Sequence, residues 1–161
     1  MREIIKAPKD CSQQELSIFE KLVLEGGEVA SQGLSGRIKL AHRLIFIELN
    51  NKCVSVGALK SPNENYKDGV FLKSGVSGES VNYQYELGYL YTSPASRGNG
   101  VGSFLMKSVC NALNGSSCFA TTRENNEVMH HLLRKANFSR LGAAYKSDQG
   151  EYCLGLFATK S

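Results

Sequence analysis

Three alternating glycines follow an arginine in the stretch from Arg97 to Ser103, at the point where an apolar segment with helical spacing begins. A helix N-terminus carries unpaired N–H groups and a partial positive charge, so it attracts phosphate. Glycines let the backbone approach an anion without intervening side chains, and an arginine adds a permanent positive charge. The residue types and their order therefore predict a phosphate-binding loop, with pyrophosphate as the expected group.

Two other phosphate-binding motifs do not fit these residues. A Walker loop ends in Gly-Lys-Ser/Thr, whereas Gly102 is followed by Ser103 and Phe104. A dinucleotide fingerprint requires glycine where Ser103 stands, and no acidic partner for a ribose stands out downstream. A nucleotide-binding protein of another fold and a glycine turn with a purely steric role remain the alternatives.

A strand-like run, residues 82–92, leads into the glycine loop and ends before Pro94. Alternation places Tyr83, Tyr85, Leu87, Tyr89 and Tyr91 on one face of this strand. Glu86 lies on the other face, eleven positions before Arg97, and the six residue steps from Glu86 to Thr92 span ~20 Å. A carboxylate there can serve as a general base, although a solvated strand carboxylate or a partner for a nearby arginine is the alternative.

The pattern Arg97-x-x-Gly100-x-Gly102, after a strand and before a helix, resembles the acetyl-CoA loop of the GNAT N-acetyltransferase superfamily. The similarity covers roughly Tyr83 to Phe138 and includes an asparagine, Asn126, at the expected interval before Phe138. The resemblance implies a mixed α/β fold of α+β character. This GNAT fold has a central, mostly antiparallel sheet of about six to seven strands, with helices on both faces.

The resemblance also implies roles for individual residues. The pantetheine arm of acetyl-CoA lies between two splayed strands in this family, so backbone groups of Leu90, Tyr91 and Thr92 are expected to contact it. Asn126 is expected to contact the cofactor from a neighbouring helix, and Glu86 is the implied catalytic base. The backbone N–H of Leu90 is the expected oxyanion donor. The implied pyrophosphate-binding residues are Arg97, Gly98, Asn99, Gly100, Val101, Gly102 and Ser103.

The sequence departs from the family pattern at one chemically important position. Many members carry a tyrosine, the general acid for the leaving thiolate, where this chain has Leu133. A thiol with a pKa of about 8.5 can depart without much help, and His131 and Tyr145 are the candidate replacements. The adjacent His130 and His131 diverge on a helix and are expected to be exposed, so no metal site is expected.

Composition narrows the class of protein. The chain has 161 residues, a formal charge of +4 and five cysteines without a CxxC pair. The length favours a single domain that comprises residues 1–161, and the cysteine pattern favours free thiols in a reducing compartment. The positive charge is smaller than that expected of a nucleic-acid-binding protein. No signal peptide or membrane span is recognisable, so a cytoplasmic protein without a membrane or nucleic-acid partner is expected.

Periodicity predicts the remaining elements. Strands are expected at 3–7, 44–50 and 53–60, helices at 13–25 and 34–43, and a tight turn at Asn50-Asn51-Lys52. Residues 61–80 form the most irregular part, with a helix only in their middle, and are expected to help shape the acceptor site. The chain is expected to end in a hairpin of strands 140–146 and 151–159.

Together these patterns predict an acetyl-CoA-dependent N-acetyltransferase, an acyltransferase with acetyl-CoA as co-substrate. The acetyl group is expected to pass to a primary amine by direct attack in a ternary complex. Small-molecule, peptide and protein amines all remain open as acceptors, as does a homodimer. The alternative is a non-catalytic acyl-CoA-binding module or sensor on the same fold.

Overall fold

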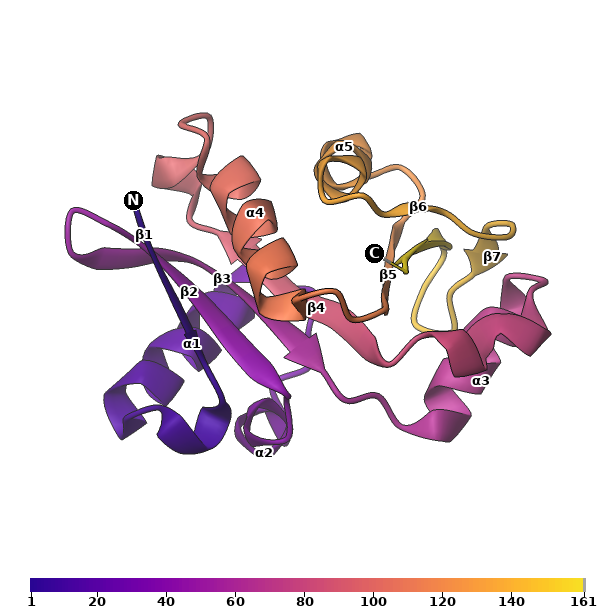
Figure 1. Cartoon of the computed structure of the whole chain (residues 1–161), viewed down its shortest axis with the longest axis horizontal. Helices are drawn as coiled ribbons and strands as arrows, with labels where there is room; N and C mark the ends of the chain where they lie inside the picture. The colour runs from indigo at the N-terminus through magenta and orange to yellow at the C-terminus, as the bar shows by residue number, and fades with distance from the viewer. Residues whose placement is uncertain (161) are drawn as a thin grey trace. The chain divides into compact units, whose positions relative to one another are not determined.

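The structure is a computed structural model that describes residues 1–160 (Figure 1). Its contacts divide the chain into two compact units. The first comprises Met1–Ser61 and Leu87–Asn114, and the second comprises Pro62–Glu86 and the chain from Gly115 onward. The expectation of a single domain stays a prediction.

The first unit contains a sheet with the strand order β1-β2-β3-β4. Its strands are β1 (Arg2–Lys6), β2 (Arg43–Leu49), β3 (Lys52–Lys60) and all but the first two residues of β4 (Tyr85–Thr92). Asn50 and Asn51 join β2 to β3 with φ values of 54° and 65°. Two successive left-handed residues make the tight hairpin turn that matches strand twist, and asparagine tolerates this conformation, so the predicted turn is confirmed.

Helices cover both faces of this sheet (Figure 1). Val56 and Ala58 of β3 belong to the core cluster that includes Phe19, whereas the intervening Gly57 faces Leu105. The helices of this unit are α1 (Gln13–Gly26), α2 (Leu34–Lys39), α4 (Val101–Leu113) and the 3-10 turns η1 (Pro8–Asp10) and η3 (Pro94–Ser96). A capping box between Ser12 and Glu15 starts α1 at the predicted residue.

The second unit is built on strand β8, which pairs antiparallel with β5, β6 and β7. The first two residues of β4 pair in parallel with β5, Tyr85 with Cys118 and Glu86 with Phe119. The elements of this unit are α3 (Glu64–Lys73), η2 (Ser77–Asn82), β5 (Cys118–Arg123), α5 (Glu127–Lys135), β6 (Ser139–Arg140), β7 (Tyr145–Lys146) and β8 (Cys153–Thr159). Its core contains Phe71, Tyr83 and Phe119.

The described residues form eight strands rather than six to seven, because the expected strand 140–146 is interrupted. It forms two short strands, β6 and β7, on either side of Gly142. There the chain turns toward α3, where Ala143 N–H donates to the Ser74 carbonyl at 2.9 Å. Gly142 has a φ of 70°. Periodicity alone does not reveal a tertiary contact of this kind.

Substitution of Gly142 tests whether close packing against Ser74 requires glycine between β6 and β7. A Cβ at position 142 would lie 2.2 Å from the Ser74 carbonyl oxygen, in a left-handed backbone that disfavours side chains. We expect Gly142→Ala to lower the free energy of unfolding by at least about 3 kcal/mol, of which about 1–2 comes from the left-handed conformation. Gly75→Ala is the matched control, because Gly75 has a φ of 80° but open space around its Cβ position. Urea denaturation that gives equal losses for the two variants would contradict the steric explanation.

No helix in the described part of the chain has the length and apolar character needed to cross a bilayer. The cytoplasmic location stays a prediction. All five cysteines are free thiols, as expected. Within residues 1–160, no three His, Cys, Asp or Glu side chains are grouped so that they could hold a metal ion.

Candidate active site

The glycine loop opens α4 in the predicted position. Gly98 and Gly100 have φ values of 81° and 79°, and Gly100 is the N-cap residue of the helix. A Cβ at either position would meet no other atom within 4 Å, so the left-handed backbone, rather than crowding, explains these glycines. No side chain caps the helix N-terminus. The geometry of the loop therefore fits a phosphate group approaching the backbone N–H groups.

Arg97 joins the loop to the preceding strand. Its Nε donates to the Thr92 carbonyl at 2.9 Å, and its guanidinium carbon lies 5.6 Å from the centre of the Tyr91 ring. Nε–H is one of five N–H donors on the guanidinium group. Arg97 can therefore brace the loop against β4 and still present a positive charge to an anion.

The end of β4 is held by Ser55 of the neighbouring strand. The buried Ser55 hydroxyl donates to the Tyr91 carbonyl at 2.9 Å and lies 2.8 Å from the Thr92 hydroxyl. The carbonyls of Tyr91 and Thr92 thus each accept one hydrogen bond within the protein. Each carbonyl oxygen has a second lone pair that can accept another. The Leu90 side chain packs over Gly57.

Tyr89 interrupts the extended backbone of β4. Its φ is 57°, which is an outlier for a bulky side chain. Its ring packs edge-on against Phe19, and the Lys60 ammonium lies 4.6 Å from the ring centre. Tyr89 and Tyr91 share a face as predicted, because both pack against the core cluster that contains Phe19. However, β4 begins at Tyr85 rather than at the predicted residue 82, and its backbone is distorted at Tyr89. Such outliers concentrate at functional sites, and only the neighbouring Gly88 hints at this one in the sequence.

Glu86 is buried in the second unit, with only 5% of its surface exposed. The Tyr66 hydroxyl of α3 donates to Glu86 Oε2 at 2.7 Å. A solvated strand carboxylate, the alternative considered above, is therefore excluded. Residues 61–80 contain a ten-residue helix, α3, that carries Tyr66, so this segment is more regular than expected. No sequence motif pointed to Tyr66.

The Glu86 carboxylate influences the pKa values of two tyrosines, Tyr66 and Tyr145. Burial of the hydroxyl, followed by the nearby Glu86 carboxylate, holds the pKa of Tyr66 well above its usual range. Burial, Glu86 and then Asp148 raise the pKa of Tyr145 to about 12. The hydrogen-bonded Thr121 hydroxyl acts on the pKa of Tyr66 in the opposite direction. Both phenols are therefore protonated at neutral pH and can act as donors.

Four positions singled out in the sequence lie on or near α5, also in the second unit. Asn126 is the N-cap, and its side-chain oxygen accepts from Met129 N–H at 3.1 Å. Leu133 is fully buried in the core. His131 is exposed as expected, but the prediction for His130 is wrong, because its half-buried ring packs 4.9 Å from the Phe157 ring.

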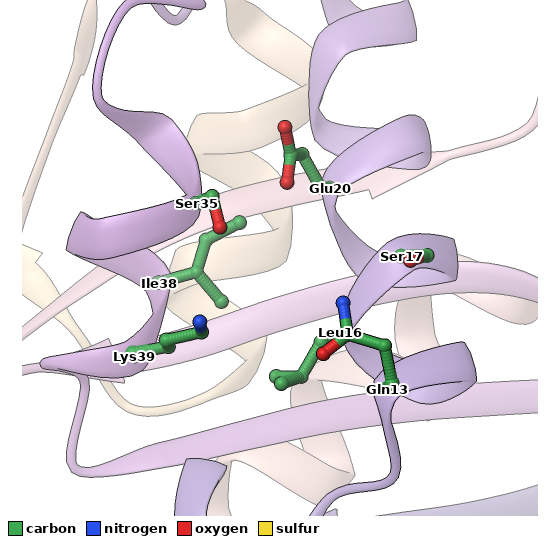
Figure 2. Close-up of a pocket in the computed structure, with 7 residues that line it drawn as sticks. All are labelled: Gln13, Leu16, Ser17, Glu20, Ser35, Ile38 and Lys39. Carbon is green, nitrogen blue, oxygen red and sulfur yellow. The ribbon is translucent and has the colours of Figure 1, made fainter.

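A shallow pocket lies between α1 and α2 in the first unit (Figure 2). Its volume of about 20 Å³ suffices for about one water molecule. None of the candidate site residues lines it, so the pocket does not extend the candidate site. Its lining residues are Gln13, Leu16, Ser17, Glu20, Ser35, Ile38 and Lys39.

The fold and these residues define a class of protein: a mixed α/β protein with an open, mostly antiparallel sheet and a glycine loop that suits a phosphate-containing ligand. Residues 14–138 match the model of the Acetyltransferase (GNAT) family, and the chain belongs to that family. The family uses acetyl-CoA and acts on small-molecule or protein amine acceptors. No curated protein matches the sequence significantly.

Solved structures share the fold at low sequence identity. An acyl-CoA N-acyltransferase from Pseudomonas aeruginosa has a TM-score of 0.70 and 14% identity over 98% of this chain and 97% of its own. An N-acetyltransferase from Staphylococcus aureus has a TM-score of 0.68 and 13% identity over 99% of each chain. YncA from Salmonella typhimurium, solved with its cofactor acetyl-CoA, has a TM-score of 0.64 and 14% identity over 99% of this chain and 94% of its own.

Proposed function

We propose that the protein is an acetyl-CoA-dependent N-acetyltransferase that acts on a primary amine by direct attack in a ternary complex. The observation that carries this proposal is the buried carboxylate of Glu86, on the same strand that runs directly into the glycine loop. Such a carboxylate can accept the proton that an ammonium group must lose before its nitrogen attacks. A small molecule, a peptide N-terminus and a protein lysine all satisfy this chemistry.

The cofactor-binding residues in this proposal are those of the loop and the end of β4. Arg97 to Ser103 bind the pyrophosphate, mainly by backbone N–H groups at the start of α4. The backbone of Leu90, Tyr91 and Thr92 contacts the pantetheine arm. Asn126, whose side-chain oxygen caps α5, adds a contact through its amide group. The left-handed glycines and the side-chain-free helix N-terminus support this assignment.

The chain's own groups then have distinct tasks. Bound acetyl-CoA supplies an activated acetyl thioester. Glu86 takes the proton from the acceptor ammonium, and the Leu90 N–H stabilises the developing oxyanion. Tyr145 is the donor that replaces the missing family tyrosine, since its phenol carries a proton at neutral pH.

A second candidate, a binding module that holds an acyl-CoA without turnover, is favoured by one observation. Leu133 occupies the position of the family's general acid, and its side chain is fully buried among apolar residues. A module of this kind would bind acetyl-CoA and would not need Glu86.

The test is product detection by mass spectrometry after incubation with acetyl-CoA and a panel of primary amines, polyamines and lysine-containing or free-N-terminal peptides. We expect an acetylated product that depends on the enzyme and is lost in Glu86→Gln. Tight acetyl-CoA binding without product across the panel would favour the binding module. Product formation that survives Glu86→Gln would refute the role of Glu86.

A further inference from the structure

We propose that Tyr66 is a positioning residue that holds the Glu86 carboxylate in a fixed orientation through a hydrogen bond. The geometry consists of the 2.7 Å hydrogen bond from the Tyr66 hydroxyl to Glu86 Oε2, at a carboxylate that is almost completely buried. A donor that hydrogen-bonds a carboxylate stabilises its charged form, whereas burial favours the neutral form.

The local structure of α3 fixes Tyr66 in place. The Asn63 side chain caps the helix and accepts hydrogen bonds from Asn65 N–H at 2.8 Å and Tyr66 N–H at 3.2 Å. The next residue, Lys67, is only 5% exposed, and its ammonium donates to the Tyr83 carbonyl at 3.0 Å. Two consecutive helix residues therefore contact the chain around the start of β4, Lys67 at Tyr83 just before the strand and Tyr66 at Glu86 within it.

The titratable groups near Glu86 include Tyr66 from α3 and Tyr145 from β7. Neither phenol loses its proton near neutral pH, so the charge on both is constant across the range in which a carboxyl group titrates. A change in the titration of Glu86 on removal of the Tyr66 hydroxyl would therefore not arise from a change of charge on either phenol.

Tyr66 also lies at the boundary between solvent and the buried carboxylate. Its residue surface is 46% exposed, although its hydroxyl lies at the buried end of the side chain. Loss of the hydroxyl should consequently leave the packing of α3 intact. The catalytic meaning of this hydrogen bond rests on the proposed function, but the hydrogen bond can be tested without turnover.

The experiment is a pH titration by NMR of protein labelled with ¹³C at the glutamate side-chain carboxyl carbon, with the Glu86 signal assigned by its loss in Glu86→Gln. We expect Tyr66→Phe to move the midpoint of the Glu86 titration to higher pH by about one unit. Tyr83→Phe is the matched control, because it removes a buried phenol hydroxyl from the same unit without touching Glu86. An unchanged midpoint in Tyr66→Phe, or an equal change in Tyr83→Phe, would overturn the proposal.

The same variants give a kinetic readout once an acceptor is identified. In a plot of kcat/KM against pH, Tyr66→Phe should move the acidic limb to higher pH by the same amount as the NMR midpoint. Tyr83→Phe should leave the position of this limb unchanged. A purely structural role for Tyr66 would lower the rate at all pH values without moving the limb. If the NMR midpoint moves but the wild-type protein acetylates no amine, the hydrogen bond stands and the proposed function fails.

Discussion

Glu86→Gln is expected to lower kcat/KM for amine acetylation by about 10²- to 10⁴-fold, the usual contribution of a positioned general base. Glutamine has nearly the same shape, and its amide oxygen can still accept the Tyr66 hydroxyl hydrogen bond. The variant should therefore fold normally and bind acetyl-CoA with a dissociation constant close to that of the wild type. Steady-state kinetics with saturating acetyl-CoA and a varied concentration of acceptor amine, together with binding measurements, would test both parts.

Glu48→Gln is the control for the loss of a negative charge. Glu48 pairs with Arg2 at the surface of the first unit, at 2.7 Å, and has no place in the proposed chemistry. Its replacement should leave kcat/KM within about twofold, since an exposed ion pair contributes little. A rate for Glu86→Gln that matched the rate of this control would show that Glu86 is not the base.

Gly100→Val is expected to raise the dissociation constant of acetyl-CoA by about 100-fold. Valine disfavours the left-handed backbone that aims the loop N–H groups, and its branched side chain would stand where the pyrophosphate approaches. Loss of one or two hydrogen bonds to a charged group, at about 1.5–3 kcal/mol each, accounts for this factor. Calorimetric titration measures the change directly.

Gly27→Val separates loop geometry from general strain. Gly27 ends α1 with a φ of 72° and, like Gly100, has open space around its Cβ position. Both variants should lose similar amounts of stability, but only Gly100→Val should weaken acetyl-CoA binding. Equal affinities in the two variants would show that the glycine loop does not hold the cofactor.

Local sequence features predicted much of the fold because their causes are local. Ser12 and Glu15 form a capping box at the start of α1, and Asn50 with Asn51 makes the hairpin turn. The glycine loop is also local, since a left-handed residue at the entrance of a helix depends on neighbouring residues alone. Its predicted position at the start of α4 is confirmed.

The features that the sequence did not predict depend on contacts between distant residues. The interruption at Gly142 arises from the approach to Ser74, and the hydrogen bond from Tyr66 to Glu86 joins residues 20 positions apart. Neither contact produces a periodic pattern or a motif. The left-handed conformation of Tyr89 was also not predictable from the sequence, because tyrosine has no intrinsic preference for this conformation. In the structure, the Tyr89 ring packs against Phe19 and Lys60, which are distant in the sequence.

Calorimetric titration of the purified protein with acetyl-CoA, compared with CoA, ATP and NAD, tests the central claim most directly. It avoids thiol-reactive dyes, which the five free cysteines would confound. We predict micromolar binding of acetyl-CoA, with CoA as the only competitor of comparable affinity. Absence of acetyl-CoA binding, or preferential binding of ATP or NAD, would contradict the proposed acetyltransferase and assign the glycine loop to another phosphate-containing ligand.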